Sequence, residues 1–179
     1  MDTVLITGGA GFIGIHTSIS LLEKGFRVII IDSLLNNSQK GVDRLKNKNY
    51  LGISILNSQL KFIKGDVRDI NFLRKVFTKE KVLGNIIRYV IHFAGLKSVR
   101  DSFLRQDLYW DVNVNGTKIL TKVMEENGCY NFVFSSSATV YSEDQESPLN
   151  EESKLLPNNP YGKTKLAAEQ FLKDFSIKS

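Results

Sequence analysis

The chain has 179 residues, 42% hydrophobic and 24% charged, which is typical of one globular domain with a core. Its net charge of +5 is scattered along the chain and forms no basic stripe, which argues against a nucleic-acid partner. Cys129 is the only cysteine, neither histidine has a Cys or His partner at metal-ligand spacing, and no apolar stretch approaches about 20 residues. We therefore expect a cytoplasmic protein without a disulfide, a metal site or a membrane span.

Short apolar runs alternate with helical segments along the chain. The runs typical of buried strands are residues 4–6, 27–31, 60–63, 89–91 and 132–134. Because these runs are continuously apolar rather than alternating, they predict strands that are covered on both faces, as in a parallel sheet.

The first helices carry recognisable start and stop signals. Ile15, Ile19 and Leu22 form an apolar stripe that ends at Gly25, and glycine is typical just after a helix. Asp69 is placed to cap the helix that follows the third run. These signals predict one helix after the first strand and another after the third.

A longer helix is expected from about residue 107 to 127, ending at Gly128, and a last helix from about residue 161. Residues 33–59 are polar and lysine-rich, which predicts a loop plus a helix, and residues 142–160 hold all three prolines, which predicts a loop. Alternating strands and helices favour an α/β fold, a doubly wound, Rossmann-like parallel sheet with helices on both faces.

A glycine-rich turn follows the first run and opens the first helix. Gly8, Gly11 and Gly14 let the turn fold tightly and bring backbone N–H groups close to a pyrophosphate. Asp32 ends the second strand, where a carboxylate accepts hydrogen bonds from an adenosine ribose and repels a 2′-phosphate. A glycine turn and a strand-end aspartate are each common without a cofactor. Their order along the chain favours a dinucleotide site, and NAD over NADP.

Two further strands end in residues that suit a nucleotide. The carboxyl ends of adjacent parallel strands line one crevice, so Asp66 is placed to meet an adenine amino group. Ala94 and Gly95 allow close backbone approach, and Lys97 is placed to meet a phosphate. Each residue alone is more typical of turn chemistry; their shared position at strand ends carries the argument.

Tyr161 and Lys165 stand four residues apart, which puts a phenol and an ammonium on one helix face. A neighbouring ammonium favours the phenolate and lowers a tyrosine pKa from about 10. Ser137 follows the fifth run and can share the proton. Together they predict proton transfer to or from an alcohol or carbonyl. A helix with one aromatic and one solvated lysine is the structural alternative for the pair alone.

A serine hydrolase would need a histidine base and a G-x-S-x-G elbow. His92 ends an apolar strand, His16 lies early in a helix, and the sequence holds no such elbow. The hydrolase interpretation is therefore disfavoured.

Five segments together resemble the extended short-chain dehydrogenase/reductase superfamily, most closely its UDP-glucose 4-epimerase branch. They are residues 7–14, 92–97, 113–117, 134–141 and 159–165. The resemblance implies that Ser137, Tyr161 and Lys165 are catalytic. It also implies NAD contacts at Gly8, Gly11, Phe12, Ile13, Gly14, Asp32, Asn36, Asp66, Val67, Phe93, Ala94, Gly95, Leu96, Lys97, Asn115, Ser135, Tyr161 and Lys165.

The resemblance implies interconversion of UDP-glucose and UDP-galactose through a transient 4-keto sugar with bound NAD, an isomerase activity of galactose metabolism. The related 4,6-dehydratases carry an Asp-Glu pair where this chain has Ala138 and Thr139, and the related decarboxylases keep a glutamate there. Neither Ala138 nor Thr139 can act as a carboxylate acid or base, so elimination and decarboxylation are disfavoured.

Members of this family continue with another strand and a region that grips the UDP-sugar. We therefore expect residues 1–179 to form the NAD-binding Rossmann domain that carries the catalytic residues, an N-terminal fragment without the C-terminal substrate region. A non-catalytic NAD-binding module and another NAD-dependent nucleotide-sugar enzyme are the alternatives. The resemblance also implies a homodimer through the helices near 107–127 and 161–176.

Overall fold

The computed structural model describes residues 1–47 and 58–178 of the chain. The chain divides into two compact units. The first comprises Met1–Ala94 and Ile119–Phe134, and the second comprises Gly95–Lys118 and Ser135–Ser179. That they fold together as one NAD-binding domain stays a prediction.

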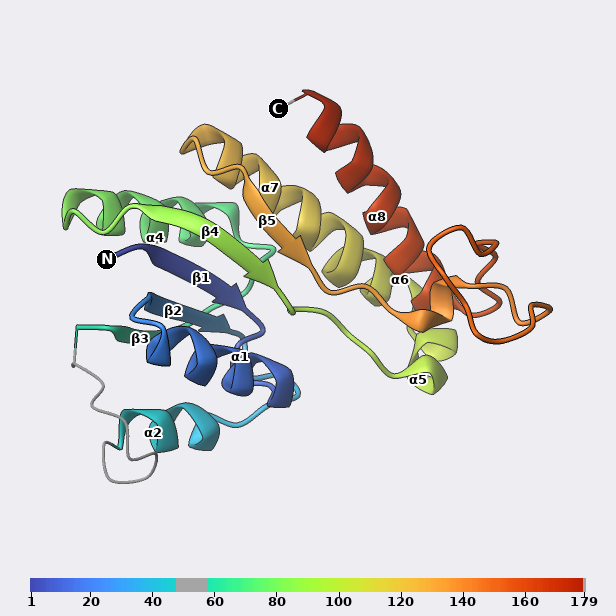
Figure 1. Ribbon diagram of the computed structural model, residues 1–179, viewed down its shortest axis with the longest axis horizontal. Helices are drawn as coiled ribbons and strands as arrows, with labels where there is room; N and C mark the ends of the chain where they lie inside the picture. Colours follow the sequence, from blue (N-terminus) through green and yellow to red (C-terminus); the bar gives the residue numbers. More distant parts are fainter. Residues whose placement is uncertain (48–57, 179) are drawn as a thin grey trace. The chain divides into compact units, whose positions relative to one another are not determined.

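The first unit is built on a five-stranded parallel sheet in the order β3-β2-β1-β4-β5 (Figure 1). Its strands are β1 (Thr3–Thr7), β2 (Arg27–Asp32), β3 (Leu60–Lys64), β4 (Ile87–His92) and β5 (Asn131–Phe134). All five predicted strands are therefore confirmed. The strand order reverses at β1, so the carboxyl ends of β1 and β4 flank the point where nucleotides bind in sheets of this kind.

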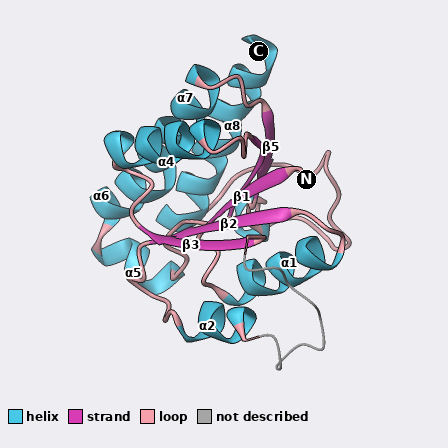
Figure 2. Ribbon diagram, turned by 90° about the vertical axis from the view of Figure 1, so that its left-hand side faces the viewer, coloured by secondary structure: helices cyan, strands magenta, loops and turns pink. Residues whose placement is uncertain are grey.

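Helices cover both faces of this sheet (Figure 2). The helices around it are α1 (Phe12–Glu23), α2 (Lys40–Lys46), α4 (Ile70–Val82) and α7 (Gly116–Glu126). Buried side chains of α1 and α2, such as Leu22 and Val42, pack on Val4 and Ile30 of one face. On the other face, side chains of α4 and α7 form a second hydrophobic cluster with residues of the sheet. Its members are Leu5, Ile29, Ile31, Leu73, Val76, Phe77, Ile87, Val90, Leu120, Val123, Met124 and Cys129. The predicted doubly wound fold is confirmed.

The second unit is helical. It contains α5 (Val99–Leu104), α6 (Gln106–Tyr109), a π-helix η1 (Trp110–Asn115), a 3₁₀ turn η2 (Ala138–Val140) and α8 (Pro160–Lys178). The predicted last helix is confirmed as α8.

The predicted helix boundaries hold because each rests on a local backbone signal. Asp69 caps α4 by accepting a hydrogen bond from Phe72 N at 2.9 Å. Gly25 and Gly128 adopt φ of +81° and +66° just beyond α1 and α7, the left-handed conformation that terminates a helix.

The predicted helix at 107–127 exists, but it is not uniformly α-helical. It begins at Gln106 in α6, widens into the π-helix η1, and continues as α7 to Glu126. The side chain of Asn113, within η1, is 2% exposed and bonds to residues outside the helix. A π-helical turn of this kind is frequent at functional sites, and periodicity alone does not reveal it.

The expectation that every strand is covered on both faces is wrong for β4 and β5. The residues of β1 and β2 are all buried, whereas Tyr89 of β4 is 37% exposed and Val133 of β5 is 60% exposed. In the parallel register these two side chains share the face that carries Val4 and Ile6. The core on that face centres on β1, β2, α1 and α2, which leaves the β4–β5 half less covered.

The two predicted irregular segments are only partly described. The helix expected within residues 33–59 is α2, while residues 48–57 lie outside the described residues. The loop expected at 142–160 is confirmed and ends at α8, and Tyr141 forms an isolated antiparallel bridge with Leu155. Within 1–47 and 58–178, no helix is both long enough and apolar enough to cross a bilayer.

Replacing Gly8 should be costly for two separate reasons. It adopts φ +67°, and a Cβ placed on it would lie 2.5 Å from the backbone nitrogen of Ala94. We expect Gly8→Ala to lower the free energy of unfolding by about 2 to 4 kcal/mol, from the left-handed backbone and the backbone clash together. Urea denaturation followed by circular dichroism measures this loss.

Gly84→Ala is the matched control, because Gly84 also has a positive φ of +76° but no atom within 4 Å of a built Cβ. Its expected cost is about 1 kcal/mol, from the backbone conformation alone. Equal losses for the two variants would show that the Gly8 contact with Ala94 is not the cause.

Candidate functional site

The glycine loop places an uncapped helix end next to the β1 strand. Gly8 N donates to Ile31 O at 2.8 Å, and Gly11 is the N-cap residue of α1 without a side-chain capping bond. Phe12 and Ile13 in the first turn are 79% and 59% exposed. The N–H groups of such a turn point outward and attract anions, so this loop suits a pyrophosphate.

Asp32 holds the glycine loop and the following loop together. Its carboxylate is 5% exposed and accepts from Ala10 N at 3.1 Å and Leu34 N at 2.8 Å. It also accepts from Asn37 Nδ2 at 3.1 Å. Three protein donors therefore orient the predicted ribose acceptor and leave it part of its acceptor capacity.

The sequence offers both Asn36 and Asn37 as ribose contacts, and only Asn36 is in the predicted set of cofactor residues. A Cβ built on Gly11 would lie 3.6 Å from the Asn37 amide, so Asn37 faces the glycine loop as well as Asp32. The signal available in the sequence was the Asn-Asn pair itself, which does not say which amide turns inward. Asn36 is exposed and lines a neighbouring pocket.

That pocket has a volume of about 640 Å³ and lies between α1, α2 and the loop before α2. His16, Lys40 and Arg44 contribute its basic side chains. The other lining residues are Ala10, Phe12, Ile15, Ile19, Asn36, Asn37, Ser38, Gly41 and Leu45. Because the described lining residues include cations and no carboxylate, the pocket favours an anion beside the glycine loop.

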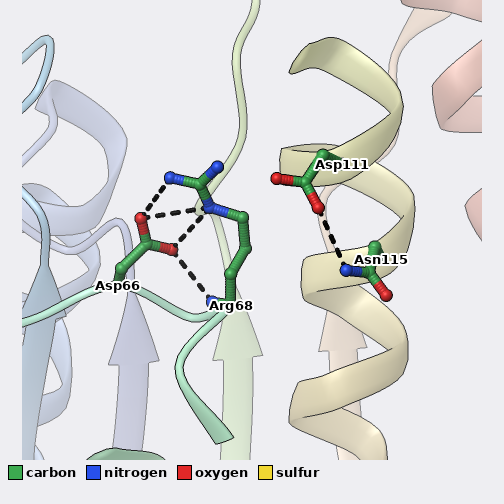
Figure 3. Close-up of polar contacts among 4 residues, drawn as sticks. All are labelled: Asp66, Arg68, Asp111 and Asn115. Atoms are coloured by element: carbon green, nitrogen blue, oxygen red, sulfur yellow. Dashed lines mark hydrogen bonds and ion pairs between the residues drawn. The ribbon is translucent and has the colours of Figure 1, made fainter. Parts of the chain in front are cut away.

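Asp66 follows β3, and Arg68 engages its carboxylate at close range (Figure 3). Arg68 Nη2 lies 2.6 Å from Asp66 Oδ2, and this contact lowers the pKa of the Asp66 carboxyl below its usual value. Val67 is buried next to it. Phe93 and Ala94 follow β4 and lie against Gly8.

His92 is the buried histidine of the sheet. Its Nδ1 lies 2.5 Å from Thr7 Oγ1, and its ring packs against Phe132 and Phe134. These contacts make His92 part of the core, in agreement with the argument against a hydrolase. Among the described residues, no group of three or more His, Cys, Asp or Glu side chains is arranged to hold a metal.

In the second unit, Tyr161 and Lys165 lie one turn apart on α8 and are 9% and 5% exposed. Lys165 Nζ donates to the carbonyl oxygen of Ser135 at 2.9 Å. Burial lowers the pKa of Lys165 from 10.5 to about 8, and Glu169 one turn further along opposes part of this change. The ammonium is therefore the main form at pH 7 and is lost in mildly basic solution.

This lowered pKa predicts a pH-dependent stability. Between about pH 8 and 10.5 the folded chain has released the Lys165 proton, while the unfolded chain still binds it. The unfolded state then binds more protons, so the free energy of unfolding rises with pH. We expect a rise of about 3 kcal/mol relative to Lys165→Met, measured by urea denaturation from pH 7 to 10.5.

Other groups titrate in this range, but they are shared by the wild-type chain and the Lys165→Met control. Only the difference between the two curves reports Lys165. Parallel curves would contradict a buried, readily deprotonated lysine.

Ser137 lies at the start of the turn η2. Its Oγ accepts from Thr139 N at 3.2 Å and lies 2.9 Å from Thr139 Oγ1. Thr139 thus holds the Ser137 hydroxyl through both its backbone N–H and its side chain.

Asn113 joins the loop after β4 to α8, and its role was not foreseen. Its Oδ1 accepts from Leu96 N at 2.7 Å, while its Nδ2 donates to Leu96 O and to Thr164 Oγ1, each at 3.0 Å. A Cβ built on Gly95 would lie 3.0 Å from this amide and 3.6 Å from Lys165 Nζ. A side chain at position 95 would therefore crowd the Asn113 amide, while its distance to Lys165 would be an ordinary contact.

Two predicted cofactor residues of this unit, Lys97 and Asn115, have exposed side chains. Lys97 is exposed at the end of the 95–97 loop. Asn115 is exposed on η1, where its Nδ2 donates to Asp111 Oδ1 at 3.0 Å (Figure 3). Their assignment to a cofactor stays a prediction.

The chain is similar to several proteins whose names refer to one reaction. It is 48% identical over 172 residues to UDP-glucose 4-epimerase 4 of Oryza sativa subsp. japonica, a match that covers 96% of this chain and 44% of the relative. The chain spans about half the length of the curated relatives it matches.

Solved structures give the same result. The crystal structure of UDP-glucose 4-epimerase from Bifidobacterium longum in complex with NAD+ and UDP matches with a TM-score of 0.88 at 41% identity, covering 99% of this chain and 50% of that one. The enzyme from Stenotrophomonas maltophila with bound NAD and formylated UDP-arabinopyranose matches with a TM-score of 0.87 at 35% identity, covering 99% and 49%.

A family model described as GDP-mannose 4,6 dehydratase matches residues 5–178, from the first strand through the Tyr161 helix. Because the match includes both the glycine loop and the Tyr161/Lys165 pair, the chain belongs to the GDP-mannose 4,6 dehydratase family.

Proposed function

We propose that this chain is the NAD-binding and proton-transferring part of a UDP-glucose 4-epimerase. The carrying observation is the buried Tyr161/Lys165 pair on α8, with the Lys165 ammonium fixed on the Ser135 carbonyl. The resemblance of the sequence, the epimerase relatives and the solved structures named for NAD and UDP support the proposal.

The residues of the first unit fit NAD. Gly8 excludes a Cβ beside the backbone of Ala94, the α1 helix end has no side-chain cap, and Asp32 presents an oriented carboxylate for a ribose. We propose that the glycine loop holds the pyrophosphate and that Asp32 and Asp66 hold the ribose and the adenine.

When bound, NAD supplies a reversible hydride acceptor for C4 of the sugar. Tyr161 takes the proton of the 4-hydroxyl as the hydride leaves C4. After the 4-keto sugar has rotated, Tyr161 returns the proton to the same oxygen as the hydride comes back to the opposite face of C4. The Lys165 ammonium supplies positive charge one helical turn from Tyr161, and the Ser137 hydroxyl orients the sugar oxygen. Each turnover therefore restores the proton to where it began.

Epimerisation is favoured over dehydration, although the family model takes its description from a dehydratase. Water elimination needs a carboxylate acid and base, and Ala138 and Thr139 occupy those positions. In the structure Thr139 instead bonds to Ser137.

We further propose a cytoplasmic role in galactose metabolism and a homodimer formed through the helices near 107–127 and 161–176. Trp110, on the first of these helices, is 43% exposed. Light scattering after size exclusion tests the dimer, and a monomer at micromolar concentration would reject it.

The proposal is tested first by cofactor content. The purified chain is denatured, and the released nucleotide is identified by mass spectrometry; NAD is expected. The second test measures interconversion of UDP-glucose and UDP-galactose by the chain alone and by a chimera joined to the part of the rice relative outside the match. If NAD is released but neither the chain nor the chimera interconverts the sugars, the chain is an NAD-binding module without this activity. If neither protein releases NAD, the proposal is rejected.

A further inference from the structure

Arg68 contacts the Asp66 carboxylate with both its guanidinium and its backbone N–H, and the proposed mechanism gives it no role. Its Nε lies 3.1 Å from both carboxylate oxygens of Asp66, and its Nη2 lies 2.6 Å from Oδ2 (Figure 3). Its backbone N–H also donates to Oδ1 at 2.9 Å. Arg68 lies two residues after Asp66, and its guanidinium and backbone N–H together form a fork of donors around the Asp66 carboxylate.

The Arg68 side chain fixes the orientation of the Asp66 carboxylate. Its hydrogen bonds are also the largest cause of the lowered pKa of the Asp66 carboxyl. A bidentate guanidinium also sets the plane of the carboxylate, which a lysine ammonium does not do.

Asp66 keeps room for one more donor. Its side chain is 32% exposed. The single Nε–H of Arg68 is shared between the two carboxylate oxygens, so these contacts do not use all of their lone pairs. An ionised carboxylate accepts hydrogen bonds and cannot donate them. A base placed at this carboxylate must therefore present a donor such as an exocyclic amino group.

We propose that Arg68 is a positioning residue that locks Asp66 as an acceptor, and that it thereby selects adenine over bases with a 6-oxo group such as hypoxanthine. The inference rests on the proposed binding of NAD. In hypoxanthine the 6-oxo oxygen faces the carboxylate in place of the amino group, and two acceptors repel each other. Without Arg68, the Asp66 carboxylate can rotate toward the ring N–H of hypoxanthine and accept a hydrogen bond from it.

The test compares NAD with nicotinamide hypoxanthine dinucleotide by isothermal titration calorimetry on the full chain. The wild-type chain is expected to prefer NAD by about 10- to 100-fold, the range for one hydrogen bond to a charged group. Arg68→Met should bring this preference below about threefold, and Arg68→Lys should retain an intermediate preference because it keeps the charge without the fork.

Arg74→Met is the matched control. Arg74 makes a similar bidentate pair with Glu126, at 2.8 and 2.6 Å, on the exposed surface of the same unit. Its loss should leave the preference for NAD unchanged.

The ratio of the two affinities separates selection from structural damage, because a distorted crevice weakens both dinucleotides together. NMR titration of the Asp66 carboxyl in the ligand-free chain supplies a second readout, and its pKa should rise in Arg68→Met. An unchanged affinity ratio in Arg68→Met would overturn the inference while leaving NAD binding intact. A wild-type chain that binds neither dinucleotide would reject the proposed cofactor and the base selection with it.

Discussion

Glu80→Ala is expected to lower the free energy of unfolding by about 3 to 5 kcal/mol, the cost of removing one partner from a buried ion pair. Glu80 lies on α4 and is completely buried. Its Oε1 lies 2.5 Å from Lys61 Nζ, and its Oε2 forms an ion pair at 2.8 Å with Arg27 Nη1, without hydrogen-bond alignment. Truncation leaves two cations beside the core with no counter-charge.

The position of Glu80 explains the size of this effect. It joins the start of β2 and the strand β3 to α4, and Arg27 is 9% exposed. Water replaces the lost carboxylate less well there than at a surface, because the Arg27 side chain is only 11% exposed, although the Lys61 side chain is 28% exposed.

Urea denaturation measures the change, and Glu126→Ala is the control, since Glu126 pairs with Arg74 on the surface. The control should lose much less stability, and its loss should disappear in high salt, whereas the Glu80 effect should persist. Similar losses in both variants would show that the buried triad contributes no more than a surface pair.

Tyr161→Phe is expected to slow epimerisation in the chimera by about 10²- to 10⁴-fold, the usual contribution of a positioned acid–base group. The phenol oxygen is the only atom removed, so the packing of the 9% exposed ring is preserved. The bound NAD should remain, because the residues proposed to hold the pyrophosphate, ribose and adenine lie in the first unit.

Tyr109→Phe is the matched control, since it removes another phenol oxygen in the same unit. Tyr109 is 2% exposed, donates to Ser98 O at 2.7 Å, and its ring meets the Tyr161 ring edge to face. It should reduce stability and leave the rate within a few-fold of wild type. A Tyr161→Phe chimera that retains more than a tenth of the activity would exclude Tyr161 as the proton carrier.

The order of elements and their ends could be predicted because their signals are local. The cap at Asp69 and the left-handed glycines Gly25 and Gly128 act within one turn of backbone, so the sequence contains the complete cause. The same holds for the Tyr161/Lys165 spacing, because a helix places those two side chains on one face whatever surrounds it.

Other features depend on residues that are distant in the chain. The π-helix η1 accompanies an inward-facing Asn113 that bonds to Leu96 and Thr164, partners 17 and 51 residues away. The burial of Lys165, which brings its pKa to about 8, likewise depends on the packing of the second unit around α8. The spacing of apolar residues along the chain indicates neither which residue Asn113 bonds to nor how deeply Lys165 is buried.

The sequence by itself determined where the strands follow one another along the chain, the glycine loop after the first strand and the place of Asp32 at the end of the second. It also determined that Tyr161 and Lys165 share one helix face. Each of these follows from backbone preferences over a few residues. Only the tertiary structure decided that Asn37 rather than Asn36 turns onto Asp32, that Arg68 closes around Asp66, and that β4 and β5 keep an exposed face. Side-chain partners and burial depend on which helices and strands pack together after folding, and a short stretch of sequence does not specify that packing.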